Sequence, residues 1–155
     1  MIIIDTSALI DSLSGARRSA PRLRRFIEEG ERISLPTIVL YEWLRGPRMT
    51  AELAAQEELL PREQALPFGA QEAAVAADLY RRVKKPRGRE IDLAIAATAI
   101  VRDAALWTLN TADFSDVPGL VLADVAQTLL SVPILRHSKT RRLSPPSIHE
   151  RHNHG

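Results

Sequence analysis

Two acidic residues interrupt segments that are otherwise apolar. Glu42 is the only charged residue in 38–44, and Asp92 is the only charged residue in 91–101. A helix that is apolar on all sides is typical of a buried helix. Because a buried ionised carboxylate costs several kcal/mol unless it is paired or bound to a metal, both acids are candidates for cation binding.

Two further acids follow predicted strands. Asp5 comes directly after 2–4, three isoleucines that predict a short strand buried on both faces of a parallel sheet. Asp113 lies four residues after 105–109, a second predicted strand. Open α/β sheets bind ligands at the carboxyl ends of their strands. If these two strands are neighbours, both acids share that edge, and a right-handed crossover brings the helix start at Asp92 there too.

Four carboxylates in one pocket repel one another, and each raises the pKa of its neighbours. Divalent cations neutralise such a cluster, and ligands that are all oxygen suit Mg²⁺ or Mn²⁺ rather than zinc. Two ions about 3.5–4 Å apart can activate a water for phosphodiester hydrolysis, which leaves a 5′-phosphate and a 3′-hydroxyl. The sequence leaves open whether one or two ions bind. The proposed ligands are Asp5, Glu42, Asp92 and Asp113.

Each acid taken alone also has a purely structural interpretation. Asp5 and Asp113 are ordinary turn residues after a strand. Asp92 is a first-turn acid that the helix dipole stabilises, and Glu42 is a solvent-facing position on an amphipathic helix. Asp116 is an alternative to Asp113. The metal hypothesis therefore depends on the four acids meeting in space.

Short strands alternate with helices along the chain. Helices are predicted at 8–13, 21–30, 37–45, 50–60, 70–83 and 91–104, and strands at 2–4, 32–35, 65–68, 105–109 and 120–122. Pro67 places the strand at 65–68 at an edge of the sheet, and Thr6 and Ser7 are candidates to cap the first helix. The alternation predicts a parallel α/β sheet.

Length and composition limit the classes of protein. A chain of 155 residues with 45% hydrophobic residues predicts one globular domain at 1–130, followed by a disordered tail at 131–155. The His-containing run 149–154 is interpreted as a polar end rather than a metal site. There is no Cys, which excludes disulfides and Cys-based zinc sites. No signal peptide or membrane span of about 20 apolar residues is evident, so we expect a cytoplasmic protein.

The order of the acidic motifs resembles the PIN domain. It comprises 3–7 (Ile-Ile-Asp-Thr-Ser), 40–42 (Leu-Tyr-Glu), Asp92 followed by 95–99 (Ile-Ala-Ala-Thr-Ala), and 108–114 (Thr-Leu-Asn-Thr-Ala-Asp-Phe). The likeness covers about residues 1–125 and is greatest to the VapC ribonuclease toxins of bacterial type II toxin–antitoxin pairs. It implies a three-layer α/β/α fold with a parallel sheet of about four or five short strands.

The resemblance also implies roles and partners. The four acids would form a Mg²⁺ pocket, Thr6 or Ser7 would orient the first ligand or its water, and Asn110 would support the last turn. The chain would then be a Mg²⁺-dependent endoribonuclease that acts as a toxin. We expect it to be inhibited by a cognate antitoxin whose tail enters the groove, to form a homodimer, and to meet DNA only through the antitoxin.

The net charge of +2 does not by itself indicate an RNA partner, because 1–130 holds 16 basic and 18 acidic residues. Basic residues beside the acidic motifs are candidates for positioning an RNA backbone, with a solvated loop as the alternative. The candidates are Arg45, Arg48, Lys85, Arg87 and Arg89, with Lys84 beside them. Tyr41, Trp43 and Trp107 are predicted to be core residues. Few aromatics then remain for base stacking, which favours a structured RNA recognised by its shape.

Two other functions compete with the nuclease. A PIN-like protein that joins an antitoxin on operator DNA, with little catalysis, would use the acids to dock an Arg of its partner. A small phosphatase of the parallel α/β type would offer an Asp nucleophile and a second Asp two residues later, but position 7 is Ser.

Overall fold

A parallel sheet lies at the centre of the chain. The computed structural model describes residues 1–123, and in this part four strands hydrogen-bond in the order β2-β1-β3-β4. The strands are β1 (Ile2–Ile4), β2 (Ile33–Ser34), β3 (Ala105–Trp107) and β4 (Val121–Leu122). All three strand pairs are parallel. The predicted sheet of about four or five short strands is confirmed.

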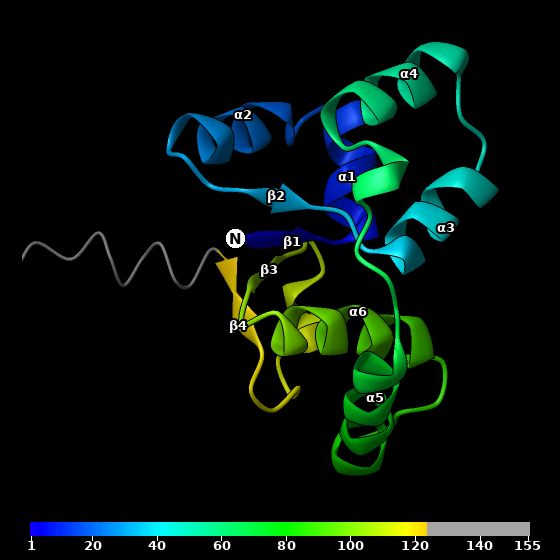
Figure 1. The fold of residues 1–155 in the computed structure, drawn as a ribbon, viewed down its shortest axis with the longest axis vertical. Helices are drawn as coiled ribbons and strands as arrows, with labels where there is room; N and C mark the ends of the chain where they lie inside the picture. Colours follow the sequence, from blue (N-terminus) through cyan, green and yellow to red (C-terminus); the bar gives the residue numbers. More distant parts are fainter. Residues whose placement is uncertain (124–155) are drawn as a thin grey trace, which may run out of the picture.

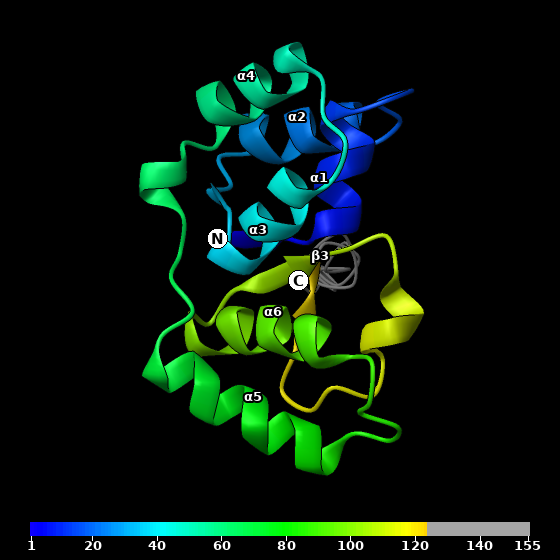
Figure 2. The same ribbon diagram turned by 90° about the vertical axis from the view of Figure 1, so that its right-hand side faces the viewer.

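Helices cover both faces of this sheet. The first four helices lie on one side and the last two on the other, as Figures 1 and 2 show from two directions. They are α1 (Thr6–Leu13), α2 (Ala20–Glu28), α3 (Thr37–Arg45), α4 (Thr50–Leu59), α5 (Ala70–Arg82) and α6 (Glu90–Val101). Two 3₁₀ helices that were not expected from the sequence are η1 (Arg62–Gln64) and η2 (Thr111–Phe114). The predicted three-layer α/β/α arrangement is confirmed.

β1 is an interior strand whose three isoleucines are at most 4% exposed. Its β-branched side chains fit a pleated surface that is covered on both faces. Ile4 is in register with Trp107 of β3. The next residue of each strand, Asp5 and Thr108, therefore leaves the sheet at the same edge.

The aromatic contact beneath this edge contributes to the stability of the fold. The rings of Phe26 and Trp107 pack edge-to-face with centroids 5.1 Å apart, and both side chains are buried. We expect Phe26→Leu to lower the free energy of unfolding by about 1 kcal/mol, because an aromatic pair of this kind contributes roughly that much beyond its buried area. Urea denaturation followed by circular dichroism measures the loss.

The matched control for this change is Phe68→Leu. Phe68 is 36% exposed in the loop before α5. The same substitution there is expected to alter stability by no more than about 0.5 kcal/mol. Equal losses in the two variants would contradict the packing described for α2 and β3.

The first helix begins earlier than predicted. It starts at Thr6 rather than residue 8, and Asp5 occupies the N-cap position without a side-chain hydrogen bond to the helix. The prediction that Thr6 or Ser7 caps this helix is therefore wrong. Both residues lie in its first turn, and their hydroxyls bind carboxylates instead.

The predicted edge strand at 65–68 is reduced to a single parallel bridge between Leu66 and Pro36. The Leu66 N–H donates to the Leu35 carbonyl at 2.8 Å, and the Thr37 N–H donates to the Leu66 carbonyl at 2.9 Å. Pro67 has no N–H with which to continue the pairing. The segment consequently extends the edge beside β2 without forming a strand.

The predicted domain end at 130, the tail at 131–155 and its His-containing run lie outside the described residues. Among residues 1–123, no helix has the length and apolar character needed to cross a bilayer.

Candidate metal centre

Asp5 is a buried carboxylate at the carboxyl end of β1. Its side chain is 4% exposed. The Ser7 hydroxyl donates to Asp5 Oδ2 at 2.8 Å, and the Thr108 hydroxyl donates to the same oxygen at 2.7 Å. Because both hydroxyls bind the same oxygen, the carboxylate is held in a fixed orientation. Within residues 1–123 no side-chain hydroxyl binds its other oxygen, Oδ1, which could therefore accept a further ligand.

The residues after β3 complete this hydrogen-bond network. The Leu109 N–H donates to Ser7 Oγ at 3.0 Å, and the Asn110 N–H donates to Thr108 Oγ1 at 3.0 Å. The Asn110 carbonyl in turn accepts the Asp113 N–H at 3.0 Å. Asn110 therefore takes part through its backbone, at the turn that leads to Asp113.

Thr108 is a site residue that the sequence interpretation missed. It is 2% exposed and bonds directly to Asp5. Thr108 was placed inside the predicted strand at 105–109, whereas β3 ends at Trp107, so Thr108 follows β3 as Asp5 follows β1. No local signal in the sequence marked it as a site residue.

Glu42 approaches the same edge from the middle of α3. Thr6 Oγ1 donates to Glu42 Oε2 at 2.5 Å, which ties α3 to the first turn of α1. Arg45 Nη2 donates to Glu42 Oε1 at 3.3 Å from the solvent side. The Glu42 side chain is 18% exposed, whereas that of Arg45 is 58% exposed. Glu42 is thus partly neutralised by a cation that remains largely in solvent.

Asp92 lies half-buried in the first turn of α6, where its pKa is raised to about 6. Burial is the largest cause, followed by the negative charges of Asp5, Asp113 and Glu42. Arg89 acts in the opposite direction with a smaller effect. The structure therefore brings Asp5, Asp113 and Glu42 within electrostatic range of Asp92.

Arg89 pairs with the side chain of Asp116 but only with the backbone of Asp113. It binds both carboxylate oxygens of Asp116, at 2.7 and 3.1 Å, and this pair holds the pKa of Asp116 below its usual value. Arg89 Nη2 also donates to the carbonyl of Asp113 at 2.6 Å, and Nη1 to that of Lys84 at 3.0 Å. Because the Asp116 charge is already paired, the geometry favours Asp113 as the fourth acid of the cluster.

The candidate RNA-contacting residues occupy different environments. Lys85 and Arg87 are exposed in the loop before α6. Arg48 lies with its guanidinium carbon 4.3 Å from the centroid of the Trp43 ring and donates to the Pro47 carbonyl at 2.7 Å. Arg89 is 19% exposed in its pair with Asp116. Lys85 and Arg87 are consequently the freest of this group to contact a ligand, and the assignment of all five stays a prediction.

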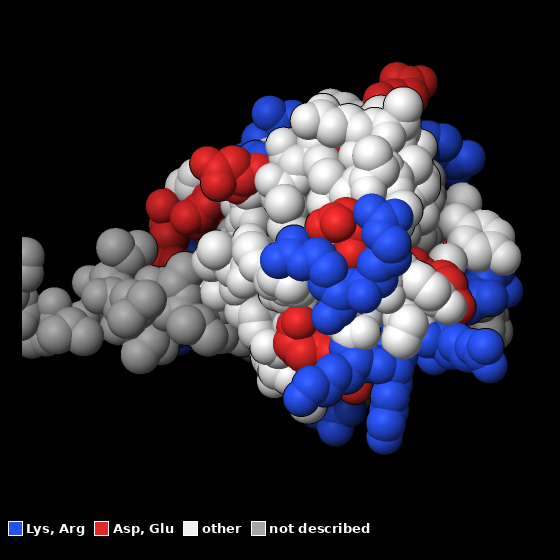
Figure 3. All heavy atoms as spheres, turned by 90° about the horizontal axis from the view of Figure 1, so that it is seen from below, with Lys and Arg blue, Asp and Glu red and all other residues white. Residues whose placement is uncertain are grey.

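Basic side chains gather on the face of the molecule that carries α5 and the loop after it. Figure 3 shows several Lys and Arg side chains around smaller acidic patches on this face. Arg81 and Arg82 at the end of α5 are exposed, as are Lys84 and Lys85 in the loop. Asp78 neutralises part of this charge, because it pairs with both arginines of α5. The remaining excess of positive charge suits a polyanion.

Two other buried acids have a structural role and a different electrostatic character. Glu52 accepts the Met49 N–H at 2.9 Å, and Glu72 accepts the Gly69 N–H at 3.0 Å, each at the start of its helix. The hydrogen bond from Met49 is the largest cause that lowers the pKa of Glu52. For Glu72 the hydrogen bond from its own backbone N–H lowers the pKa most, and the bond from Gly69 adds to it. The pKa of these two hydrogen-bonded acids is therefore lowered, whereas the pKa of Asp92 is raised because its surroundings disfavour the charge.

The donor set fits a hard divalent cation, although the carboxylates are not gathered into a ready-made coordination shell. Across residues 1–123, no three Asp, Glu or His side chains form a group that could ligate a metal as they stand. The four acids of the hypothesis offer only carboxylate oxygens, a donor type that suits Mg²⁺ or Mn²⁺. Burial and then the neighbouring negative charges raise the pKa of Asp92, so a cation nearby would favour its ionised form.

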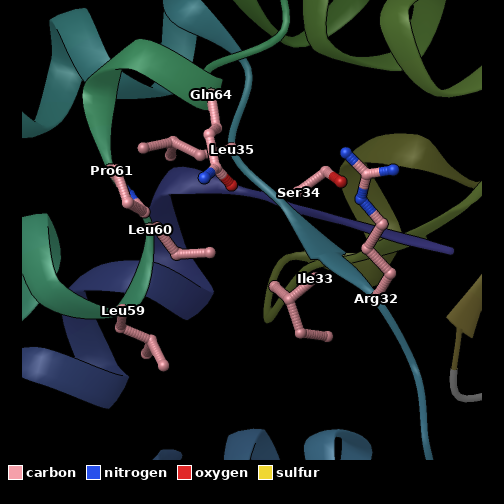
Figure 4. Close-up of a pocket in the computed structure, with 8 residues that line it drawn as sticks. All are labelled: Arg32, Ile33, Ser34, Leu35, Leu59, Leu60, Pro61 and Gln64. Atoms are coloured by element: carbon pink, nitrogen blue, oxygen red, sulfur yellow. The ribbon is translucent and has the colours of Figure 1, made fainter.

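A small cavity elsewhere is not part of this centre. It has a volume of about 40 Å³ and lies beside β2, between that strand and the segment after α4 (Figure 4). Its lining residues are Arg32, Ile33, Ser34, Leu35, Leu59, Leu60, Pro61 and Gln64. None of the four clustered acids lines it.

Comparison with known proteins places this architecture in a family. Residues 2–120 match the family model of the PIN domain. Over 122 residues the chain is 37% identical to Ribonuclease VapC19 of Mycobacterium tuberculosis, a match that covers 77% of this chain and 97% of the relative. The chain belongs to the PIN domain family, within the VapC ribonucleases.

Solved structures share the fold over most of its length. A toxin–antitoxin complex from Klebsiella pneumoniae is similar with a TM-score of 0.61 and 25% identity, covering 78% of this chain and 96% of that chain. DNA-bound VapBC from Salmonella typhimurium is similar with a TM-score of 0.60 and 25% identity, covering 78% and 95%.

Proposed function

We propose that this chain is the toxin of a toxin–antitoxin pair and hydrolyses RNA as a Mg²⁺- or Mn²⁺-dependent endoribonuclease. The observation that carries the proposal is the approach of Asp5, Asp113 and Glu42 to the half-buried Asp92, whose pKa is raised first by burial and then by these three charges. Four acids from separate segments of the chain approach one edge of a parallel sheet, where such folds bind ligands. The 37% identity to a protein named ribonuclease supports RNA as the substrate.

The residues around the acids would prepare them for metal binding. Ser7 and Thr108 hold one oxygen of Asp5, and Thr6 holds one oxygen of Glu42. When bound to the four carboxylates, Mg²⁺ would supply activation of a water and neutralisation of the leaving oxygen. A nearby cation would favour the ionised form of Asp92, whose surroundings disfavour its charge.

The same comparison supports an antitoxin as a partner. The similar structures from Klebsiella and Salmonella are a toxin–antitoxin complex and a DNA-bound VapBC. We therefore expect this chain to bind a cognate antitoxin and to meet DNA only through it. A homodimer is expected as well, and the exposed Lys85 and Arg87 are expected to contact the RNA backbone.

Incubation of the purified chain with total bacterial RNA tests the activity. Cleavage in the presence of Mg²⁺ or Mn²⁺, its loss on addition of EDTA, and products with a 5′-phosphate are the expected results. Cleavage that persists in EDTA would contradict the metal mechanism. Complete lack of cleavage, together with antitoxin-dependent binding to operator DNA, would favour a regulatory protein instead.

Arg89 is expected to support the reaction by holding η2 in place. Removing the side chain in Arg89→Ala releases the bonds to Asp116 and the Asp113 carbonyl. We expect cleavage at limiting Mg²⁺ to fall about 10-fold, the usual effect of losing a residue that orients a metal ligand. Arg89→Lys should recover only part of the activity, because a lysine cannot form the paired hydrogen bonds.

Arg24→Ala is the control for this prediction. Arg24 is an exposed arginine on α2, away from the acids. This variant should cleave RNA like the parent chain. Equal rates in Arg89→Ala and Arg24→Ala over the whole range of Mg²⁺ would show that Arg89 does not position Asp113.

A further inference from the structure

Tyr41 is an exposed aromatic residue at the candidate metal centre. Tyr41 was predicted to be a core residue together with two tryptophans, and for Tyr41 this prediction is wrong. Trp43 is fully buried and Trp107 is 2% exposed, whereas Tyr41 is 57% exposed. Of the Phe, Tyr and Trp residues of the chain, all of which lie within residues 1–123, Tyr41 is the most exposed.

The Tyr41 ring is linked to the acids through Arg45. The guanidinium carbon of Arg45 lies over the ring, 5.4 Å from its centroid. The same guanidinium donates to Glu42 Oε1 at 3.3 Å, and the other oxygen of Glu42 accepts the Thr6 hydroxyl. One side chain therefore separates an exposed aromatic ring from a carboxylate of the metal centre.

An open aromatic ring with a guanidinium over it has the chemistry of a nucleobase platform. Bases stack on Tyr rings and on Arg planes whatever their sequence, and the guanidinium also attracts the phosphate of the same nucleotide. Resting on the proposed ribonuclease function, we propose that Tyr41 and Arg45 form a stacking site for one base of the RNA, next to the phosphate that lies over the acids.

The surroundings of the ring favour a nucleotide over a protein partner. The ring lies beside the charged groups of Arg45 and Glu42, and Arg45 is itself 58% exposed. Tyr and Arg are enriched at protein interfaces as well, but carboxylates such as Glu42 are depleted there, whereas alternating aromatic and basic groups are typical of single-stranded nucleic-acid sites. The Tyr41–Arg45 pair consequently fits an unpaired nucleotide, rather than the structured RNA expected when no aromatic was thought to be accessible.

Binding in the absence of metal tests this site separately from catalysis. Fluorescence anisotropy in EDTA gives the Kd for a fluorescein-labelled single-stranded RNA oligonucleotide of mixed sequence. We expect Tyr41→Ala to raise the Kd by about 5- to 150-fold, the effect of losing one stacked base. Tyr41→Phe should bind like the parent chain, because its ring is retained.

A series of oligonucleotides with an abasic ribose at each position in turn identifies the stacked base. At one position, removal of the base should raise the Kd of the parent chain about as much as Tyr41→Ala raises it. Removal of the same base should not raise the Kd of Tyr41→Ala any further. The matched control is Tyr80→Ala, which removes an exposed tyrosine on α5. That variant should not change the Kd.

The outcomes separate this inference from the proposed function. If the parent chain binds RNA and Tyr41→Ala binds equally well, the stacking site is excluded while the ribonuclease proposal stands. The same holds if Tyr41→Ala changes only self-association in analytical ultracentrifugation, which would make the ring a protein contact. Absence of RNA binding by the parent chain in EDTA would overturn the stacking site, while cleavage in Mg²⁺ tests the ribonuclease proposal independently.

Discussion

Asp5→Asn is expected to lower the rate of RNA cleavage more than about 100-fold. The substitution keeps an oxygen that can accept the hydrogen bonds from Ser7 and Thr108, but it removes the negative charge at the buried end of β1. Residues that merely orient a metal ligand contribute about 10- to 100-fold to metal affinity or activity, so loss of a ligand should cost more. Single-turnover cleavage of a labelled RNA at saturating Mg²⁺ measures the effect.

Asp103→Asn is the matched control, because Asp103 is an exposed acid at the opposite end of α6 from Asp92. Its backbone has a φ of 50°, a conformation that Asn adopts readily. The control should fold and cleave RNA at the parent rate. If Asp5→Asn also cleaved at that rate while retaining the same circular dichroism spectrum, Asp5 would have no part in the reaction.

The second large effect concerns stability: Asp92→Asn should make the metal-free chain more stable at neutral pH. The native state raises the pKa of Asp92 from 3.8 to about 6, so native Asp92 binds its proton more tightly than unfolded Asp92 does. The free energy of unfolding of the parent chain therefore falls as the pH rises between these two values. Above about pH 6 the Asp92 carboxylate is ionised among like charges, and the loss in the free energy of unfolding has reached its full size.

The expected gain in Asp92→Asn is about 2 kcal/mol at neutral pH. The whole pKa shift corresponds to about 3 kcal/mol, and solvent screening of this half-buried group reduces it. Urea denaturation in EDTA measures the difference at several pH values. It should disappear below about pH 4, where the parent carboxyl is protonated in both the native and the unfolded state. If Asp92→Asn were less stable than the parent chain at neutral pH, the surroundings of Asp92 would not disfavour its negative charge.

These two predictions describe one property of the site. Acids gathered for metal binding destabilise the metal-free fold, because their charges repel before a cation arrives. Added Mg²⁺ should therefore raise the Tm of the parent chain and leave that of Asp92→Asn nearly unchanged. Glu72 provides the contrast, since its paired carboxylate gives stability that is lost as the pH falls through its lowered pKa.

The acids of the candidate site could be predicted because each interrupts a pattern that packing imposes. Three consecutive isoleucines predict an interior strand, and the structure confirms it with Asp5 at its carboxyl end. Asp92 stands out in an apolar helix, most of which is buried. Right-handed crossovers between parallel strands then bring both segments to one edge of the sheet.

Thr108 and Arg89 could not be assigned in this way, because their roles depend on partners that are distant in sequence. Thr108 bonds to a residue 103 positions away, and Arg89 pairs with Asp116, 27 positions away. Neither interrupts a local pattern. Arg89 was expected to contact RNA as part of a basic loop, yet it is bound within the chain, which local charge cannot reveal.

Tyr41 was misplaced because a short apolar helix does not show which of its sides is covered. Val39 and Trp43 are four residues apart, lie on one face of α3, and are both fully buried. Tyr41 lies midway between them in sequence and so points about opposite to that face. Only the packing of α3 against its neighbours decides that this side of the helix is open.

Diffraction from crystals grown with Mn²⁺ tests the central claim most directly. An anomalous peak within coordination distance of the Asp5 and Asp92 carboxylates, absent in crystals of Asp92→Asn, is the result that this account predicts. Crystals that bind no Mn²⁺ between these residues at a saturating concentration, or in which a basic side chain of the same protein fills that space, would contradict it.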